Sequence, residues 1–253
     1  MRRAAHTLPL AVLAGLALAA APASAALLAF DDFSTYTDGN ISGQTGSPVG
    51  FEAGAWSSGG ITATTVSGGV VTSSGNGFRT HRALSPSISI GTVYIRTNLA
   101  LGTAADSFQA LELSVAENNG DTNAVRITGG ANLNINVTGV GASNTAITTN
   151  DGANHEWLIE LNLDTGAGQV WLDGNTAAFD PSTGASAFTA SAGFSINAIN
   201  LATFDGGSGP SVALDDIQIG QSWSDVGVNA IPEPSAVALL GLGGLALLRR
   251  RRK

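Results

Sequence analysis

The chain of 253 residues has no cysteine and only three histidines. The absence of cysteine excludes disulfide bonds, zinc–thiolate sites and cysteine nucleophiles. Of the histidines, His6 lies near the N-terminus, and His81 and His155 stand in different sequence contexts. We therefore do not expect a multi-histidine metal site. A domain of about 200 residues without disulfides must be stabilised by core burial alone.

Positive charge is nearly absent between residues 26 and 230. This segment of 205 residues has no lysine and four arginines against 18 acidic residues, a formal net charge of −14. Nucleic-acid binding needs Lys and Arg to neutralise phosphates, so the composition excludes nucleic acid as a partner. An acidic surface suits solubility, divalent cations or neutral glycans. The four arginines are Arg79, Arg82, Arg96 and Arg126.

The most specific pattern lies at residues 231–253. Pro232-Glu233-Pro234 precedes an uncharged apolar run over residues 236–248. This run predicts a short transmembrane helix whose basic end stays in the cytoplasm. It is short for a permanent anchor, because thirteen helical residues rise only about 20 Å and a hydrocarbon core is about 30 Å thick. The basic end consists of Arg249, Arg250, Arg251, Arg252 and Lys253.

These features, in this order, resemble the PEP-CTERM sorting signal of Gram-negative bacteria that make exopolysaccharide. The resemblance implies that a membrane-embedded exosortase cuts near Pro232-Glu233-Pro234 and passes the body to the cell surface or extracellular matrix. An ordinary single-pass anchor is the alternative, but it needs no Pro-Glu-Pro and is usually longer. We therefore predict a sorting signal that associates only transiently with the inner membrane.

The N-terminus predicts export as well. A basic start at residues 1–7 is followed by an apolar stretch and then by Ala23-Ser24-Ala25, the small-x-small pattern that signal peptidase reads. We expect cleavage after Ala25. The predicted organisation is a signal peptide at 1–25, one domain at 26–230 and the sorting signal at 231–253.

The body is predicted to be all-β. Apolar residues alternate in short runs, which indicates half-buried strands. Turn signals such as Asp164-Thr165-Gly166 and Gly129-Gly130 separate these runs, and many short strands at this spacing favour an antiparallel β-sandwich. The runs include Val93, Ile95 and Leu99, then Leu111, Leu113 and Val115, then Leu133, Ile135 and Val137, then Trp157, Ile159, Leu161 and Leu163.

Three stretches of the body resemble a concanavalin A-like, laminin-G-like jelly roll. They are Phe30-Asp31-Asp32-Phe33, the hairpin from Leu158 to Asp173, and the closing run from Leu214 to Gly220 with Trp223 after it. The resemblance implies that the first and last strands are neighbours. The two Asp-Asp pairs would then lie near each other.

Calcium is the one metal that the sequence suggests. In the closing run, Val212 and Leu214 share one parity and Ile217 and Ile219 the other. The buried face of the strand therefore changes parity between Leu214 and Ile217, which requires either a β-bulge or an inward carboxylate. An inward carboxylate needs donors or a cation, and calcium takes oxygen ligands. The candidates are Asp31, Asp32, Asp215 and Asp216; the alternative is a carboxylate that accepts backbone N–H bonds at a bulge.

Enzymatic activity is not expected. Some concanavalin A-like glycosidases carry Glu-x-Asp-x-Glu on one strand, and the nearest match here is Glu156-x-Leu158-x-Glu160. Leucine replaces the central aspartate, so nothing evident tunes one glutamate as acid and the other as nucleophile. We predict no catalytic residue and no obligatory cofactor.

The predicted function is structural or adhesive: a cell-surface or matrix protein within exopolysaccharide. A lectin-like module is the alternative, because aromatic faces rimmed by polar side chains bind sugars. Parity places its candidate residues opposite the core, where they can line the concave face of a sheet. They are Tyr94, Arg96, Asn134 and Trp171.

Overall fold

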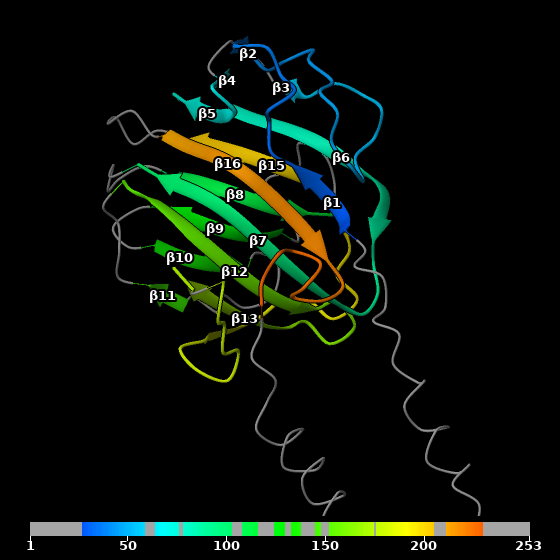
Figure 1. Ribbon diagram of the computed structural model, residues 1–253, viewed down its shortest axis with the longest axis vertical. Helices are drawn as coiled ribbons and strands as arrows, with labels where there is room; N and C mark the ends of the chain where they lie inside the picture. Colours follow the sequence, from blue (N-terminus) through cyan, green and yellow to red (C-terminus); the bar gives the residue numbers. More distant parts are fainter. Residues whose placement is uncertain are drawn as a thin grey trace, which may run out of the picture.

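In the computed structural model, the described part of the chain folds into two antiparallel β-sheets that pack face to face (Figure 1). None of the described residues is helical, so they include no helix able to cross a membrane. The all-β sandwich prediction is confirmed; the predicted signal and C-terminal helices fall outside the described residues. The described ranges are 27–58, 64–75, 78–102, 108–115, 124–129, 133–137, 145–147, 152–174, 176–204 and 211–229.

The larger sheet has nine strands. The first strand, β1 (Leu27–Asp31), pairs with the last, β16 (Ser211–Gly220), off the main path of this sheet. The main path runs in the spatial order β14 (Ser186–Thr189), β13 (Ala167–Leu172), β12 (Asn154–Asn162), β7 (Thr92–Leu101), β16 (Ser211–Gly220), β5 (Val70–Ser74), β4 (Thr64–Ser67) and β2 (Gly39–Asn40).

The smaller sheet has seven strands and packs against the first. Its order is β11 (Thr145–Ile147), β10 (Leu133–Val137), β9 (Ala124–Gly129), β8 (Phe108–Ser114), β15 (Ile196–Phe204), β6 (Phe78–Ile88) and β3 (Ser57–Ser58).

The first and last strands are neighbours, as the concanavalin A-like resemblance implies. β1 and β16 pair antiparallel, with Asp31 opposite Ile217. Three further neighbouring pairs in the large sheet, β12 with β7, β7 with β16 and β16 with β5, also join distant parts of the sequence. The centre of this sheet, where the candidate site lies, is therefore built from non-local pairs.

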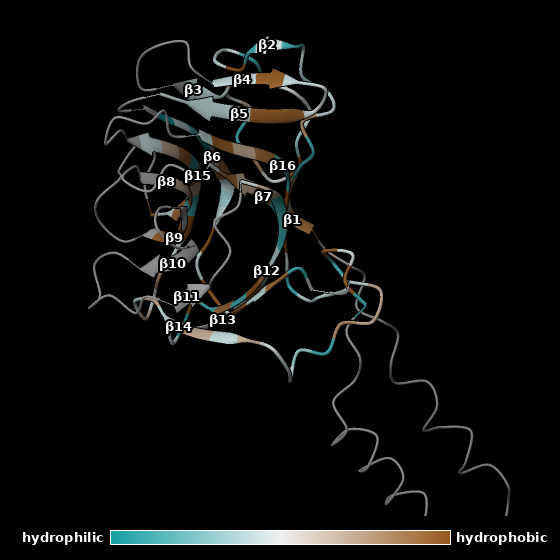
Figure 2. Cartoon of the chain, turned by 90° about the vertical axis from the view of Figure 1, so that its left-hand side faces the viewer, coloured by the Kyte–Doolittle hydropathy of each residue, from teal (hydrophilic) through white to brown (hydrophobic). Residues whose placement is uncertain are grey.

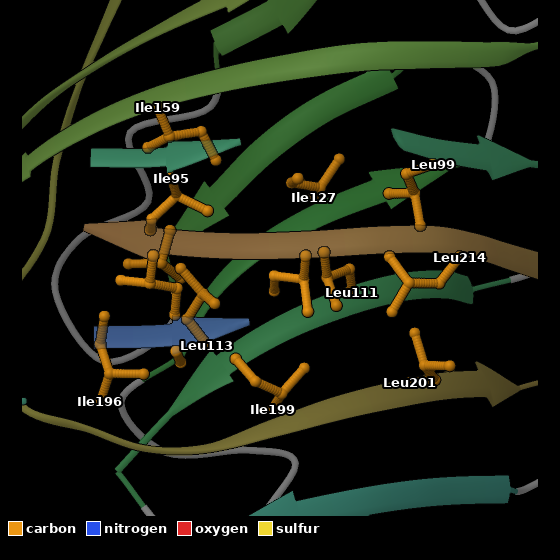
Figure 3. Close-up of a cluster of buried hydrophobic side chains, with 14 of the residues drawn as sticks. Ile95, Leu99, Leu111, Leu113, Ile127, Ile159, Ile196, Ile199, Leu201 and Leu214 are labelled. Carbon is orange, nitrogen blue, oxygen red and sulfur yellow. The ribbon is translucent and has the colours of Figure 1, made fainter. Parts of the chain in front are cut away.

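The hydrophobic core lies between the sheets, and the predicted alternation produces it. Ile95 and Leu99 from β7 face Leu111 and Leu113 from β8 and Leu201 from β15 (Figure 3). All five are at most 2% exposed, and β7 alternates buried and half-buried along its whole length. The alternation is visible along β16 as changes between brown and paler stretches (Figure 2). Side chains of the predicted run at Leu133 are not among those described.

The turn after β12 shows why glycine is needed there. Gly166 has a φ of +78°, a left-handed conformation that side chains disfavour. A Cβ at this position would lie 2.1 Å from the carbonyl oxygen of Ala190. Because the Ala190 amide also donates a 2.7 Å hydrogen bond to the Gly166 carbonyl, this contact fixes the hairpin against the segment after β14.

Candidate functional site

Polar side chains form a hydrogen-bonded row on the outer face of the large sheet, across β12, β7 and β16. Arg96 Nε donates to Glu156 Oε1 at 2.8 Å. Asn98 donates to Asp216 Oδ1 through its side chain at 2.8 Å and its backbone N–H at 3.0 Å. Gln218 Nε2 donates to Asp216 Oδ2 at 3.0 Å. The carboxylates of the row therefore accept hydrogen bonds from side chains of the row itself.

An apolar group, which we call the outer cluster, covers the same face beside this row. Leu158 on β12 and Trp171 on β13 are cross-strand partners, 0% and 4% exposed. The Trp171 ring centroid lies 5.2 Å from that of Phe179 and 5.4 Å from that of Trp223, both edge-to-face. Such pairs are favourable beyond their buried area. The outer cluster consists of Leu158, Trp171, Phe179, Trp223, Val226 and Val228.

Half of the outer cluster comes from residues 221–229, which we call the C-terminal segment. This segment follows β16 and curls over β7 and β12 (orange in Figure 1). The Val228 N–H donates to the Trp223 carbonyl at 2.9 Å. The Asn229 N–H donates to the Thr176 carbonyl at 2.8 Å, and the Phe179 N–H donates to the Asn229 carbonyl at 3.0 Å. The chain is therefore held to the sandwich as far as Asn229.

A surface pocket of about 400 Å³ opens where the C-terminal segment meets β7. The rings of Tyr94 and Trp223 meet edge-to-face in it, with centroids 4.8 Å apart. Burial, and secondarily the charge of Glu160, raises the pKa of Tyr94, so its hydroxyl keeps its proton and can donate. The pocket is lined by Tyr94, Ser222, Trp223, Ser224, Val228 and Asn229.

The structure does not bring the four predicted glycan-binding residues together. Asn134 lies on β10, in the sheet opposite the other three, so a shared concave face is wrong. Trp171 is buried, and its Nε1 donates to the Thr183 carbonyl at 2.8 Å. Arg96 is paired with Glu156. Of the four, Tyr94 lines a pocket.

The glutamates of the Glu156-x-Leu158-x-Glu160 pattern share a face of β12, as their spacing requires. Leu158 at their centre is fully buried in the outer cluster. Glu156 is held by Arg96, and its backbone N–H donates to Asp173 Oδ1 at 3.1 Å. A polar catalytic group at the central position would have to displace the outer cluster.

Asp31 points inward, but protein donors occupy both of its oxygens. Tyr36 Oη donates to Oδ2 at 2.7 Å, and the Phe33 N–H donates to Oδ1 at 3.0 Å. Arg82 Nη1 and Trp56 Nε1 in turn donate to the Tyr36 hydroxyl at 2.5 Å and 3.0 Å. Burial raises the pKa of Asp31 above its ordinary value. Phe33, Tyr36 and Trp56 of this network belong to the hydrophobic core.

Of the two alternatives for the closing strand, a β-bulge or an inward carboxylate, the structure has a register shift typical of a β-bulge. The register of β16 against β7 shifts between Leu214 and Asp216. Asp216 accepts a backbone N–H there, which is the alternative to calcium that the sequence left open. The two Asp-Asp pairs lie near each other, because β1 pairs antiparallel with β16 and Asp31 is opposite Ile217. Desolvation, then the charges of Asp216 and Asp32, raise the pKa of Asp215. The described residues contain no group of three or more His, Asp or Glu placed to hold a metal, and calcium stays a prediction.

The smaller sheet holds a buried ion cluster that was not predicted from the sequence. Glu112 is 0% exposed and lies between Arg126, whose Nε is 2.8 Å from Oε1, and Arg79, whose Nε is 3.4 Å from Oε2. Burial raises the pKa of Glu112 despite both guanidinium groups. The alternation along β8 places Glu112 on the other face of the strand from Leu111 and Leu113. No local sequence pattern indicates that this outer face of the smaller sheet is buried.

Beyond the last described residue, residues 230–253 match the family described as the PEP-CTERM protein-sorting motif. This chain carries a PEP-CTERM sorting motif. The motif indicates export, processing by an exosortase and cell-surface sorting in Gram-negative bacteria. It begins at the residue after Asn229, so no spacer separates it from the docked C-terminal segment. Its predicted residues, like those of the signal peptide, lie outside the described part: Ala23, Ala25, Pro232, Glu233, Pro234, Arg249, Arg250, Arg251 and Arg252.

No curated protein sequence matches this chain. Solved structures similar to it include a β-glucanase of Bacillus licheniformis, 9% identical with a TM-score of 0.47, covering 75% of this chain and 96% of that one. A cellulose-induced protein is 17% identical with a TM-score of 0.48, covering 76% and 97%. A pseudo β-1,3-glucanase of Mycobacterium tuberculosis is 16% identical with a TM-score of 0.46, covering 76% and 98%. We base the proposed function on this chain's own residues.

Proposed function

We propose that this protein is displayed at the cell surface or in the matrix after exosortase processing, and that it has a structural or adhesive, non-enzymatic role in exopolysaccharide. The observation that carries the proposal is the junction at Asn229. A folded β-sandwich, bonded down to its last described residue, meets the sorting motif directly. Cleavage near Pro232 would release a compact body with almost no loose tail.

The proximity also defines how the body meets the enzyme. From Asn229 to Pro232 is three residues, which span at most about 10 Å when extended. The exosortase must therefore act close to the surface formed by the C-terminal segment. From Asn229 to the apolar run at Ala236 is seven residues, or at most about 25 Å. Before processing, the sandwich is held near the membrane.

A non-enzymatic role fits the outer face of the large sheet. The carboxylates of Glu156 and Asp216 are bonded to Arg96, Asn98 and Gln218. Leu158, at the position between two glutamates of a glycosidase-like pattern, is buried. A catalytic acid or base must lie within hydrogen-bond reach of the substrate, and in this row both carboxylates are already bonded to donors of the protein.

A neutral polymer is the partner that suits the charge of the body. Its four arginines are engaged: Arg79 and Arg126 with Glu112, Arg96 with Glu156, and Arg82 with Tyr36. Fourteen acidic charges remain uncompensated by the sequence, so a polyanion would be repelled at low ionic strength.

The test is the fate of a Pro232→Ala/Pro234→Ala double variant in an exosortase-positive Gram-negative host. We expect the full-length variant to stay uncut in the inner membrane while the parent reaches the surface or matrix. A Pro48→Ala/Pro181→Ala variant, altered at two prolines of the sandwich, should be processed normally. Normal release of the first variant would contradict the proposal.

The matrix role has its own test. The parent protein should co-sediment with exopolysaccharide, and in a polysaccharide-deficient strain it should appear in the medium instead. Equal retention on both kinds of cell would mean that another surface component holds it.

A further inference from the structure

We infer that the pocket between Tyr94 and the C-terminal segment binds a neutral sugar unit of a polysaccharide. The inference rests on the proposed function and deepens it, because it assigns the adhesive contact to one site. The pocket of about 400 Å³ lies at the low end of the range for small-molecule sites, about 300–1,000 Å³. It is large enough for one sugar ring and too small for a folded partner.

The lining of the pocket matches the two kinds of surface that a pyranose presents. The Tyr94 and Trp223 rings, 4.8 Å apart, supply apolar area for the C–H face of a sugar. Ser222, Ser224 and Asn229 supply hydroxyl and amide groups for the sugar hydroxyls. Together they give an apolar floor with a small number of polar groups, as small-molecule sites do.

The lining also selects against other ligands. None of its six residues carries a formal charge at neutral pH. An anion would meet no arginine or lysine among them, and a metal ion would meet no carboxylate. A neutral, hydroxyl-rich ligand needs neither a cationic side chain nor a carboxylate in its site.

The pocket is preformed by hydrogen bonds within the C-terminal segment. Ser222 Oγ and Ser224 Oγ are 2.8 Å apart and share a hydrogen bond. The Asp225 N–H donates to Ser222 Oγ at 3.3 Å, and the Gln221 N–H donates to Asp225 Oδ2 at 2.8 Å. Beneath them, Trp223 is fixed by the outer cluster. A preformed site loses less conformational entropy on binding.

The experiment titrates the processed protein, recovered from an exosortase-positive host, with neutral hexose oligosaccharides (glucan, mannan and galactan tetramers). Polygalacturonate serves as the acidic probe. Fluorescence of the four tryptophans, of which Trp223 lines the pocket, reports binding, and calorimetry gives the affinity. We expect at least one neutral oligosaccharide to bind and to quench the fluorescence, and polygalacturonate not to bind.

Two variants test the site. Tyr94→Leu removes an aromatic wall and Asn229→Ala removes a rim amide; each should weaken neutral-sugar binding about fivefold or more. Asn154→Ala is the matched control, since Asn154 is exposed and lies on β12 opposite Ala100, six residues along β7 from Tyr94. That is about 20 Å away. The urea midpoints of all three variants should stay close to that of the parent protein, which shows that each variant is folded.

Three results would overturn the inference: no binding of any neutral oligosaccharide, tighter binding of polygalacturonate, or neutral-sugar binding that both pocket variants retain. The proposed function fails separately. If the processed protein does not reach the surface or matrix, that proposal is contradicted whatever the pocket binds; if it reaches the matrix without sugar binding, only the pocket assignment is lost.

Discussion

Trp223→Ala is the substitution that tests most sharply whether the C-terminal segment is part of the folded body. Trp223 is 8% exposed and its ring lies within 4.8–5.4 Å of the rings of Tyr94, Trp171 and Phe179. A buried tryptophan side chain removes about 200 Å² from water, or about 5 kcal/mol at 25 cal/mol per Å². Because the segment lies at the surface and can partly collapse, we expect a loss nearer about 3 kcal/mol in the free energy of unfolding.

Urea denaturation followed by circular dichroism measures this loss. With a slope of about 2 kcal/mol per M, the midpoint should fall by about 1.5 M. Limited proteolysis should cut the variant within residues 221–229 before the rest of the chain. Ile90→Ala is the control, because Ile90 is 78% exposed and should change stability by less than about 0.5 kcal/mol. A loss below about 1 kcal/mol for Trp223→Ala, with an unchanged proteolytic pattern, would refute the packing described here.

Three further predictions follow from single contacts. Gly166→Ala should cost about 2 kcal/mol or more, and clearly more than Gly193→Ala in parallel urea titrations, because both have positive φ but a Cβ at Gly193 meets nothing within 4 Å. Burial raises the pKa of Asp31, so the folded state binds this proton more tightly than the unfolded state. Parental stability relative to Asp31→Asn should therefore fall as pH rises from 3.8 through the folded-state pKa; a flat difference in urea titrations across that window would contradict the burial argument. A double-mutant cycle of Arg96→Ala and Glu156→Ala should give a coupling of about 1 kcal/mol that weakens with salt, since both side chains keep some exposure, and no coupling at low salt would mean that the 2.8 Å contact adds nothing.

The alternation of apolar residues was sufficient to predict the sandwich and its inward faces. It works for β7 because one face of this strand is buried against the other sheet, which leaves a period of two in the sequence. The change of parity after Leu214 predicted either a bulge or an inward carboxylate for the same reason, and the register shift of β16 decides for the bulge.

The outer cluster was less accessible to sequence reasoning. Trp171 comes from a strand, Phe179 from a connection and Trp223 from the C-terminal segment, and these have no shared period. One signal was present: Trp157, Leu158 and Ile159 are consecutive and apolar, and a strand with apolar residues of both parities is covered on both faces. This signal indicates that both faces of β12 are covered. It does not indicate that residues 221–229 cover the outer face.

Apart from the pairing of the first and last strands, which the resemblance implied, sheet membership could not be read from the sequence. Asn134 and Trp171 were expected to share a face because each has the parity opposite the core. β10 and β13 belong to different sheets, and pairing between distant strands is set by packing rather than by local pattern. The same holds for Glu112, whose burial depends on what covers the smaller sheet.

The intact mass of the protein from each cell fraction tests the central claim most directly. The account predicts a surface or matrix species that starts at Ala26 and ends near Pro232–Pro234, within a few residues of the docked Asn229. A species in the inner membrane that keeps the apolar run and the terminal arginines would contradict it, and would make residues 230–253 an ordinary anchor.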